Sequence, residues 1–236
     1  MIRKIFVLLF ICMMNMGCDP ALKPETKMVP NHVVQIKDAQ SADVYLRMFS
    51  GNLNIGAKGL ALMVGTYTYN NPIWVPTMNY KEIDQKGWLM VTQDEVPTIG
   101  SFSRNDAMNR WDIQFDKKIP IELTIEFGKG HGTFDLNEVA LNRLKLLNRN
   151  GALDIDLSAR VLKDDLVLWI NNEAGDINIS LPKNVGVRVT TVRGAEIVAD
   201  GLIKENAVYK NELEGSDVKH IYLDIKSDAG TIIIRK

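Results

Sequence analysis

The chain has 236 residues, of which 46% are hydrophobic and 24% are charged, a balance that is ordinary for a folded protein and argues against disorder. Lysine and arginine total 28 against 29 aspartate and glutamate residues, so the formal net charge is −1. Because the chain has no basic surplus, we expect no nucleic-acid partner.

Residues 1–17 have the parts of a bacterial secretory signal. Arg3 and Lys4 form the basic start, and Ile5–Met14 is an apolar run of ten residues. A helix that spans a bilayer needs about 20 apolar residues, so this run is too short for a stable anchor. We therefore expect a signal peptide at residues 1–17 and a chain that lies outside the cytoplasm.

The residues Asn15-Met16-Gly17-Cys18 resemble the lipobox of bacterial lipoproteins, in which the cysteine becomes the lipidated first residue of the mature chain. Asn15 stands where that pattern usually has leucine. The resemblance implies that Cys18 carries acyl chains such as palmitate, and several chains on one residue anchor a protein to a membrane without a transmembrane helix. Cleavage would also remove Cys12, the only other cysteine, so the mature chain would have no disulfide and no cysteine metal ligand.

Residues 18–32 form the predicted tether between the lipid and the folded part. The stretch contains Pro20, Pro24 and Pro30 among mostly polar residues. Proline fixes φ and favours an extended backbone, so the tether is expected to be semi-rigid. It would hold the folded part away from the membrane surface.

From residue 33 onward, apolar and polar residues alternate with a period of two, which predicts half-buried strands in two modules, at residues 33–104 and 105–236. The clearest such segments are 33–36, 44–48, 52–55, 88–91 and 112–115. Helical spacing occurs only at Gly59–Val64 and Glu138–Leu144, and both stretches are too short to carry a helical layer. The expected fold class is all-β.

The second module repeats a unit that consists of a strand, a polar turn with glycine and another strand. The glycines of the five copies are Gly132, Gly151, Gly175, Gly194 and Gly230. Glycine accepts a positive φ in the turn, and the alternating flanks put aliphatic side chains on one face of each strand. One unit cannot bury its own apolar face, so the repetition predicts a stacked-strand, β-solenoid-like architecture.

These segments carry a family resemblance. Asp43–Gly56, Tyr67–Pro72 and Gly87–Gln93 resemble the N-terminal module of bacterial toast-rack proteins. Asn109–Phe115 and Phe127–Leu136 resemble the module that follows it, which is similar to LiaF-like envelope-stress proteins and to adhesin-like proteins. The resemblance covers about residues 33–236 and implies an extracytoplasmic all-β toast-rack fold in a family without an assigned reaction. LiaF-like members resemble inhibitors of a membrane sensor kinase and carry transmembrane helices that have no counterpart in this sequence.

The glycine-rich stretch at residues 128–132 looks most like a ligand site. It matches neither GxxxxGK[ST] nor GxGxxG, and a strand pattern follows it in place of the helix that a phosphate site needs. His131 is a possible metal ligand, but His32 and His220 are the only other histidines and neither is paired with it at zinc-site spacing. We expect a turn with solvated Lys129 and His131, and we predict no metal and no cofactor.

Asp154 and Asp156 are the candidate catalytic carboxylates. Residues two apart in a strand share a face at a separation of about 6.5–7 Å, which suits the acid and base of an inverting glycosidase. Plain strand alternation places aspartates in the same way, so catalysis is the alternative interpretation. Asp164 and Asp165 are expected in a solvated turn, because a calcium site needs about six to eight oxygen ligands.

The four tryptophans, Trp74, Trp88, Trp111 and Trp169, could line a glycan platform. Trp88 and Trp111 lie in alternating strands, where packing in the core is the simpler expectation. The sequence therefore predicts a non-enzymatic, lipid-anchored protein of the bacterial cell envelope that binds an envelope protein or a glycan. Two alternatives stay open: a β-helix carbohydrate-active enzyme that uses surface carboxylates, and a regulator of an envelope-stress sensor.

Overall fold

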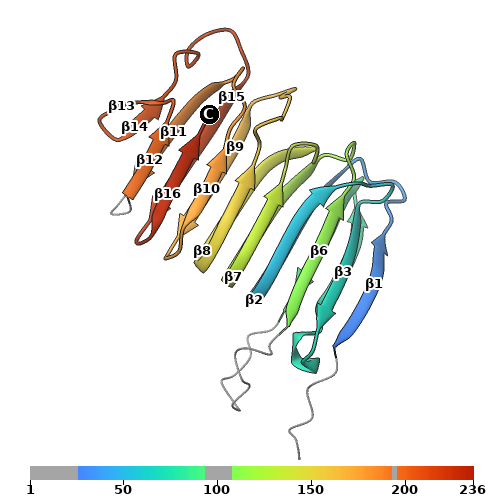
Figure 1. Cartoon of the computed structure of the whole chain (residues 1–236). Helices are drawn as coiled ribbons and strands as arrows, with labels where there is room; N and C mark the ends of the chain where they lie inside the picture. The colour runs from blue at the N-terminus through green and yellow to red at the C-terminus, as the bar shows by residue number, and fades with distance from the viewer. Residues whose placement is uncertain (1–25, 94–107, 193–195) are drawn as a thin grey trace, which may run out of the picture.

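The computed structural model describes residues 26–93, 108–192 and 196–236, in which 16 strands and one short 3-10 helix, η1 (Pro72–Trp74), are found (Figure 1). The predicted signal peptide, Cys18 and most of the tether lie outside these residues, as does the predicted module boundary between residues 104 and 105. The strands are β1 (Lys27–Val34), β2 (Ser41–Ala57), β3 (Met63–Tyr69), β4 (Thr77–Ile83), β5 (Lys86–Thr92), β6 (Asn109–Phe115), β7 (Ile121–Asp135), β8 (Leu141–Asp156), β9 (Leu166–Asn172), β10 (Ile177–Ser180), β11 (Gly186–Val192), β12 (Glu196–Asp200), β13 (Ile203–Glu205), β14 (Val208–Lys210), β15 (His220–Ser227) and β16 (Thr231–Arg235).

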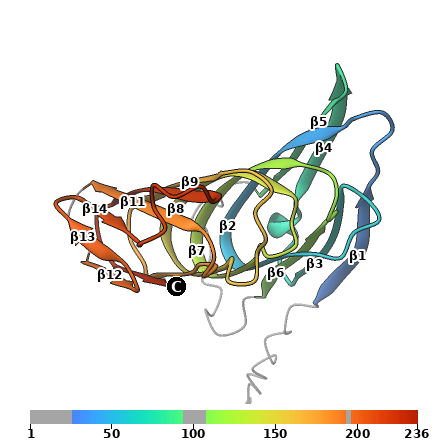
Figure 2. The same ribbon diagram turned by 90° about the horizontal axis from the view of Figure 1, so that it is seen from above.

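The strands belong to one sheet that is wound into a flattened coil, so that two layers face each other across a core (Figure 2). The long strands β2, β7 and β8 pass from one layer to the other. The first part of β2 pairs with β5 and its last part with β6, and β8 pairs in the same way first with β9 and then with β10. The first layer therefore runs from β4 through β5, β2, β7, β8, β9 and β15 to β11, and the second layer runs from β1 through β3, β6, β2, β7, β8, β10 and β16 to β12.

Apolar side chains form ladders inside the coil because the stacked parallel strands stay in register. One ladder of the first layer consists of Leu46, Ile125, Leu146, Ile170 and Ile225, all of which are buried. Full burial of each such side chain contributes about 1.5–3 kcal/mol relative to its exposure to water. The ladders explain how a unit that cannot bury its own apolar face becomes stable when several units stack, and the predicted all-β stacked-strand fold is confirmed.

The glycine-rich stretch of β7 is a bend within one continuous strand, whereas the sequence predicted a turn between two strands. The bend lies at Gly130, which has a φ of 122° and pairs with Gly51 and Gly151 of the neighbouring strands. A Cβ on Gly130 would collide with the carbonyl oxygen of Gly51, so the close stacking of the strands also requires glycine. The choice of Gly132 as the turn glycine was wrong: Gly132 is already inside the core, where a Cβ would lie 2.6 Å from Leu153 Cδ2.

Buried polar side chains join the bends of successive strands. Asn148 and Asn172 occupy neighbouring positions in β8 and β9, and Ser227 follows in β15. Nδ2 of Asn148 donates to Oδ1 of Asn172 at 2.7 Å and to the carbonyl oxygen of Gly151 at 2.9 Å. Nδ2 of Asn172 donates to Oγ of Ser227 at 3.0 Å and to the carbonyl oxygen of Gly175 at 3.0 Å. These bonds satisfy polar groups that have no access to water, and they fix the relative position of the bends.

Neither helical candidate forms a helix. The residues before Met63 lie in a loop and Met63 begins β3, while the residues before Leu141 lie in a loop and Leu141 begins β8. A helix of one or two turns forms too few hydrogen bonds to offset the free-energy cost of nucleation. Pairing with a neighbouring strand satisfies the backbone groups of the residues that join β3 and β8. In the part of the chain that the structure describes, no helix has the length and apolar character needed to cross a membrane.

Candidate functional site

A groove lies on the outer face of the first layer, across the neighbouring strands β4, β5, β2 and β7, and we name it the Trp88 groove. Figure 2 shows the hairpin rising away from the coil beside β2. The groove has a volume of about 490 Å³. Its lining residues are Asp43, Val44, Tyr45, Asn79, Lys81, Trp88, Leu89, Met90, Glu122 and Thr124.

Strand alternation places Trp88 in the groove. Leu89 and Val91 face the core and are buried, and Trp88 and Met90 alternate with them. The side chains of Trp88 and Met90 consequently point outward and remain 42% and 43% exposed. The expectation that Trp88 packs in the core was wrong, because β5 already fills its inner face with aliphatic residues. Trp111 is fully buried, as expected.

Lys86 holds the indole ring of Trp88 in place. Its Nζ lies 5.1 Å from the ring centroid and 2.7 Å from Oδ1 of Asp43. The hydrogen bond to Asp43 raises the pKa of Lys86, so the ammonium group stays charged near the ring. A cation over an exposed aromatic face stabilises the arrangement by about 0.5–1 kcal/mol. The ring is therefore preorganised before any ligand arrives.

Polar groups surround the ring of Trp88. Tyr45 and Thr124 contribute hydroxyl groups from the floor of the groove, and Asn79 contributes an amide from the hairpin. The carboxylate of Glu122 lies 3.6 Å from the guanidinium of Arg143. Burial, followed by the hydrogen bond with Glu126, raises the pKa of Tyr45, so its hydroxyl stays neutral and its proton is shared with that carboxylate. The groove can thus stack against a flat apolar face and hydrogen-bond to hydroxyl groups beside it.

Glu82 fixes the hairpin against the loop between β1 and β2. Its Oε1 accepts hydrogen bonds from the backbone N–H of Lys37 at 2.8 Å and from the hydroxyl of Tyr80 at 2.7 Å. Its Oε2 accepts from the backbone N–H groups of Asp38 at 3.0 Å and Ala39 at 3.1 Å. The hydrogen bond from Lys37, aided by those from Tyr80 and Asp38, lowers the pKa of Glu82 to about 2.

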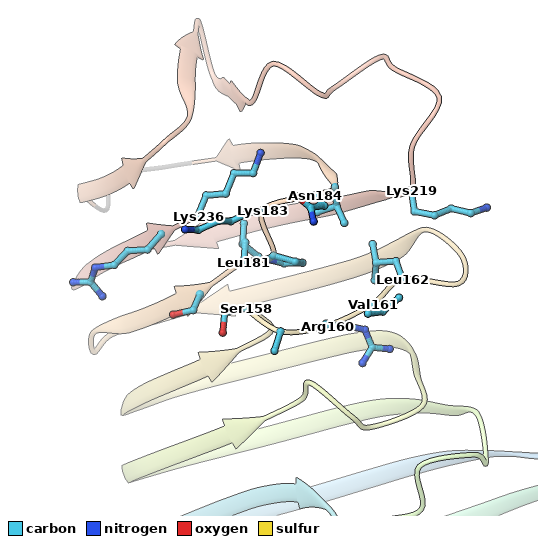
Figure 3. Close-up of a pocket in the computed structure, with 14 residues that line it drawn as sticks. Ser158, Arg160, Val161, Leu162, Leu181, Lys183, Asn184, Lys219 and Lys236 are labelled. Carbon is cyan, nitrogen blue, oxygen red and sulfur yellow. The ribbon is translucent and has the colours of Figure 1, made fainter.

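A second concave site, which we name the corner cavity, lies where the chain returns from the second layer to the first (Figure 3). Its volume is about 730 Å³. Arg160 closes its base: one terminal nitrogen donates to the carbonyl oxygens of Leu136 and Val139 at 2.7 Å each, and the other donates to that of Leu141 at 2.8 Å. These bonds fix the conformation of the return loop. Both terminal nitrogens of the Arg160 guanidinium are therefore bonded within the protein.

The candidate ligand residues at the glycine-rich stretch do not form a binding site. Lys129 is exposed, and His131 is exposed with its Nε2 3.3 Å from Oδ2 of Asp154. His32 packs edge-on against Tyr67, and His220 donates its backbone N–H to Asp165. Within the described ranges, no group of three or more His, Cys, Asp and Glu side chains could hold a metal ion. The solvated position predicted for Lys129 and His131 agrees with the structure.

The two candidate catalytic carboxylates lie on the outer face of the second layer. Asp154 accepts a hydrogen bond from Nδ2 of Asn178 at 2.8 Å. Asp156 accepts from the backbone N–H of Ser158 at 2.8 Å and from Nδ2 of Asn137 at 3.0 Å. Burial raises the pKa of Asp156, but these hydrogen bonds outweigh it and bring the pKa below its ordinary value. A general acid needs a raised pKa, so Asp156 is unsuited to protonating a leaving group.

The remaining candidates have separate places in the fold. Trp74 belongs to η1 and packs against the core, while Trp169 lies on the outer face of the first layer with Lys145 Nζ 5.3 Å from its ring centroid. Asp164 and Asp165 are exposed in the loop before β9, as expected. A platform made of all four tryptophans does not form.

Sequence reasoning missed most of the Trp88 groove. Tyr45, Asn79 and Glu122 come from three strands that are not adjacent in the chain, and no local pattern marks them. One signal was present in the sequence of β5. Lys86, Trp88 and Met90 occupy every second position, and the positions between them hold only apolar residues or glycine. That spacing places all three on the outer face of β5.

Comparison with known proteins gives one family match and several similar structures. Residues 23–180, more than half of the chain, match the family described as the N-terminal domain of toast_rack, DUF2154. The crystal structure of a candidate cell adhesion protein from Clostridium sporogenes is 29% identical, with a TM-score of 0.82 over 90% of this chain and 99% of that chain.

Two further crystal structures, both of candidate adhesins, are more distant. The one from Bacteroides fragilis is 12% identical over 89% of this chain and 98% of that chain, with a TM-score of 0.36. The one from Parabacteroides merdae is 11% identical over 89% and 80%, with a TM-score of 0.22. No curated protein matches the chain. The family match, the stacked strands and the similarity to the Clostridium structure lead to one conclusion: the chain belongs to the toast-rack family.

Proposed function

We propose that this protein is a non-enzymatic binding module of the bacterial cell envelope, anchored by lipid at Cys18, which binds a carbohydrate in the Trp88 groove. The main support is the exposed and preorganised ring of Trp88 in a groove that also contains hydroxyl, amide and carboxylate groups. The similarity to a candidate cell adhesion protein agrees with a binding role outside the cytoplasm.

The shape and chemistry of the groove favour a sugar over a protein segment. A pyranose ring presents a flat face of C–H groups that can stack on an indole, and its hydroxyl groups need the mixed donors and acceptors that Asn79 and Thr124 supply. A volume of about 490 Å³ lies within the range of small-ligand sites, which is about 300–1,000 Å³.

The test measures binding of the purified full chain to immobilised bacterial surface polysaccharides. Trp88→Ala should weaken binding by about tenfold or more, because the stacking surface is lost. Trp169→Ala is the matched control, since Trp169 lies on the same face of the sheet outside the groove. Equal binding by wild type and Trp88→Ala, or binding to proteins but not to any polysaccharide, would refute the proposal.

A further inference from the structure

The corner cavity gathers positively charged side chains. Its charged lining side chains are Arg160, Lys183, Lys219, Arg235 and Lys236, and its lining includes no aspartate or glutamate. Arg160 is bonded to backbone carbonyls, but the other four have no ion-pair partner among the residues that the structure describes. Elsewhere in the fold, cations such as Lys86 and Lys210 are paired with carboxylates at 2.7 and 2.8 Å.

The charges are concentrated at one part of the rim. In Figure 3, Lys183, Asn184 and Lys236 lie near one another above Leu181, while Lys219 extends away from the cavity. Arg235 lies in β16, where it is the register partner of Ser180 in β10 and of Asp200 in β12. The two lysines beside Asn184 are therefore the groups that an anion would meet.

Part of the cavity wall is apolar. Leu162, Leu181 and Pro182 line it, and Val161 at its edge is 86% exposed. Large aliphatic side chains lose free energy when they stay in water, so this wall favours a ligand that covers it. A ligand that satisfies both parts has an anionic head and a partly apolar body.

We propose that the corner cavity binds a phosphate group carried by an organic body, with Lys183 and Lys236 as its cationic ligands. Lysine ammonium groups bind phosphate as compact point charges, and Asn184 and Ser158 offer hydrogen-bond donors at the same cavity. The volume of about 730 Å³ admits a phosphate and part of its body. A free phosphoester and a phospholipid headgroup share this chemistry. The site is separate from the Trp88 groove and does not depend on the function proposed for that groove.

The experiment titrates the purified full chain with two probes and follows the amide resonances by NMR. Glycerol 1-phosphate represents a free phosphoester, and monomeric dihexanoylphosphatidylglycerol represents a lipid headgroup with its acyl chains. The double variant Lys183→Ala/Lys236→Ala should raise the dissociation constant of the bound probe by about tenfold or more, because two charge-assisted contacts are lost. The double variant Lys58→Ala/Lys129→Ala removes two exposed lysines elsewhere in the fold and should leave the dissociation constant unchanged.

The outcomes distinguish a free phosphoester from a lipid headgroup, and both from non-specific attraction to positive charge. Tighter binding of glycerol 1-phosphate identifies a free phosphoester, and tighter binding of the lipid identifies a headgroup; both support the proposal if binding depends on Lys183 and Lys236. No binding of either probe would overturn it. The same is true if both double variants weaken binding equally, which would indicate general attraction to positive charge. Circular dichroism of each variant confirms that it is folded.

Discussion

At the scale of single residues, the bends of the coil depend on glycines and buried asparagines that stack from strand to strand. Gly130 combines a φ of 122° with a close approach to the carbonyl of Gly51, so it is restricted both by its own backbone and by its neighbour. Asn148 and Asn172 then tie the following bends together with side-chain hydrogen bonds. Backbone geometry and side-chain bonding thus act at the same edge of the coil.

Gly130→Ala should destabilise the fold by about 2–4 kcal/mol, because the new Cβ adds a collision with the Gly51 carbonyl to the strain of a positive φ. Gly215→Ala is the control. Gly215 also has a positive φ, of 86°, but a Cβ there would meet nothing within 4 Å, so only the strain of about 1–2 kcal/mol is expected. Urea unfolding of both variants measures the difference. If both variants lost the same stability, the stacking of the bends would not be what requires glycine at position 130.

At the scale of elements, the β4–β5 hairpin is the part of the fold whose position makes the Trp88 groove. In the described part of the chain, the strand pairing of the hairpin with the coil is that of β5 with β2, and the carboxylate of Glu82 adds an attachment at the loop of residues 37–39. The width of the groove therefore depends on a charged group whose own pKa is strongly lowered by that attachment.

Glu82→Gln should loosen the hairpin and lower the urea midpoint of unfolding at neutral pH. The folded pKa of about 2 lies below the ordinary value of 4.5, so the stabilisation is fully present above pH 4.5 and is lost as the pH falls toward 2. The gap in midpoint between wild type and Glu82→Gln should therefore shrink between pH 4.5 and 2. Glu212→Gln, at an exposed position, should match wild type throughout. A gap that did not change with pH would contradict a role for the ionised carboxylate.

The elements also show how far the sequence predicts this fold. Alternation identified those strands that bury one face, such as β2, β6 and β9, whereas β4 and β13 have no buried residue and were not predicted. The choice between Gly130 and Gly132 failed because glycines at alternate positions look equivalent until the neighbouring strands are placed: one is needed by the bend and the other by Leu153 and Phe134 in the core. Trp88 was misplaced for a different reason: its large aromatic side chain favoured the core, although Leu89 and Val91 at the alternate positions of β5 already mark the buried face.

At the scale of the whole molecule, the coil has two concave sites with different chemistry. The Trp88 groove lies on the outer face of the first layer and is built around an aromatic ring, whereas the corner cavity lies at the return loops and is built around unpaired lysines. The strand ladders connect both sites to one core, so the two sites are held on a common frame. If both proposals hold, one molecule can bind both ligands at once, because the two sites share no lining residue.

Attachment at Cys18 decides whether the coil is held at a membrane. Cys18→Ala should abolish incorporation of labelled palmitate, because the lipobox resemblance assigns the acyl chains to this residue. Cys12→Ala is the matched control: it changes the only other cysteine, which lies within the predicted signal peptide, and should leave incorporation intact. Labelling of the variants in bacterial cells, followed by mass spectrometry of the mature amino terminus, measures both. Palmitate on the Cys18→Ala chain would show that the anchor lies elsewhere, and the tether of residues 18–32 would then need another explanation.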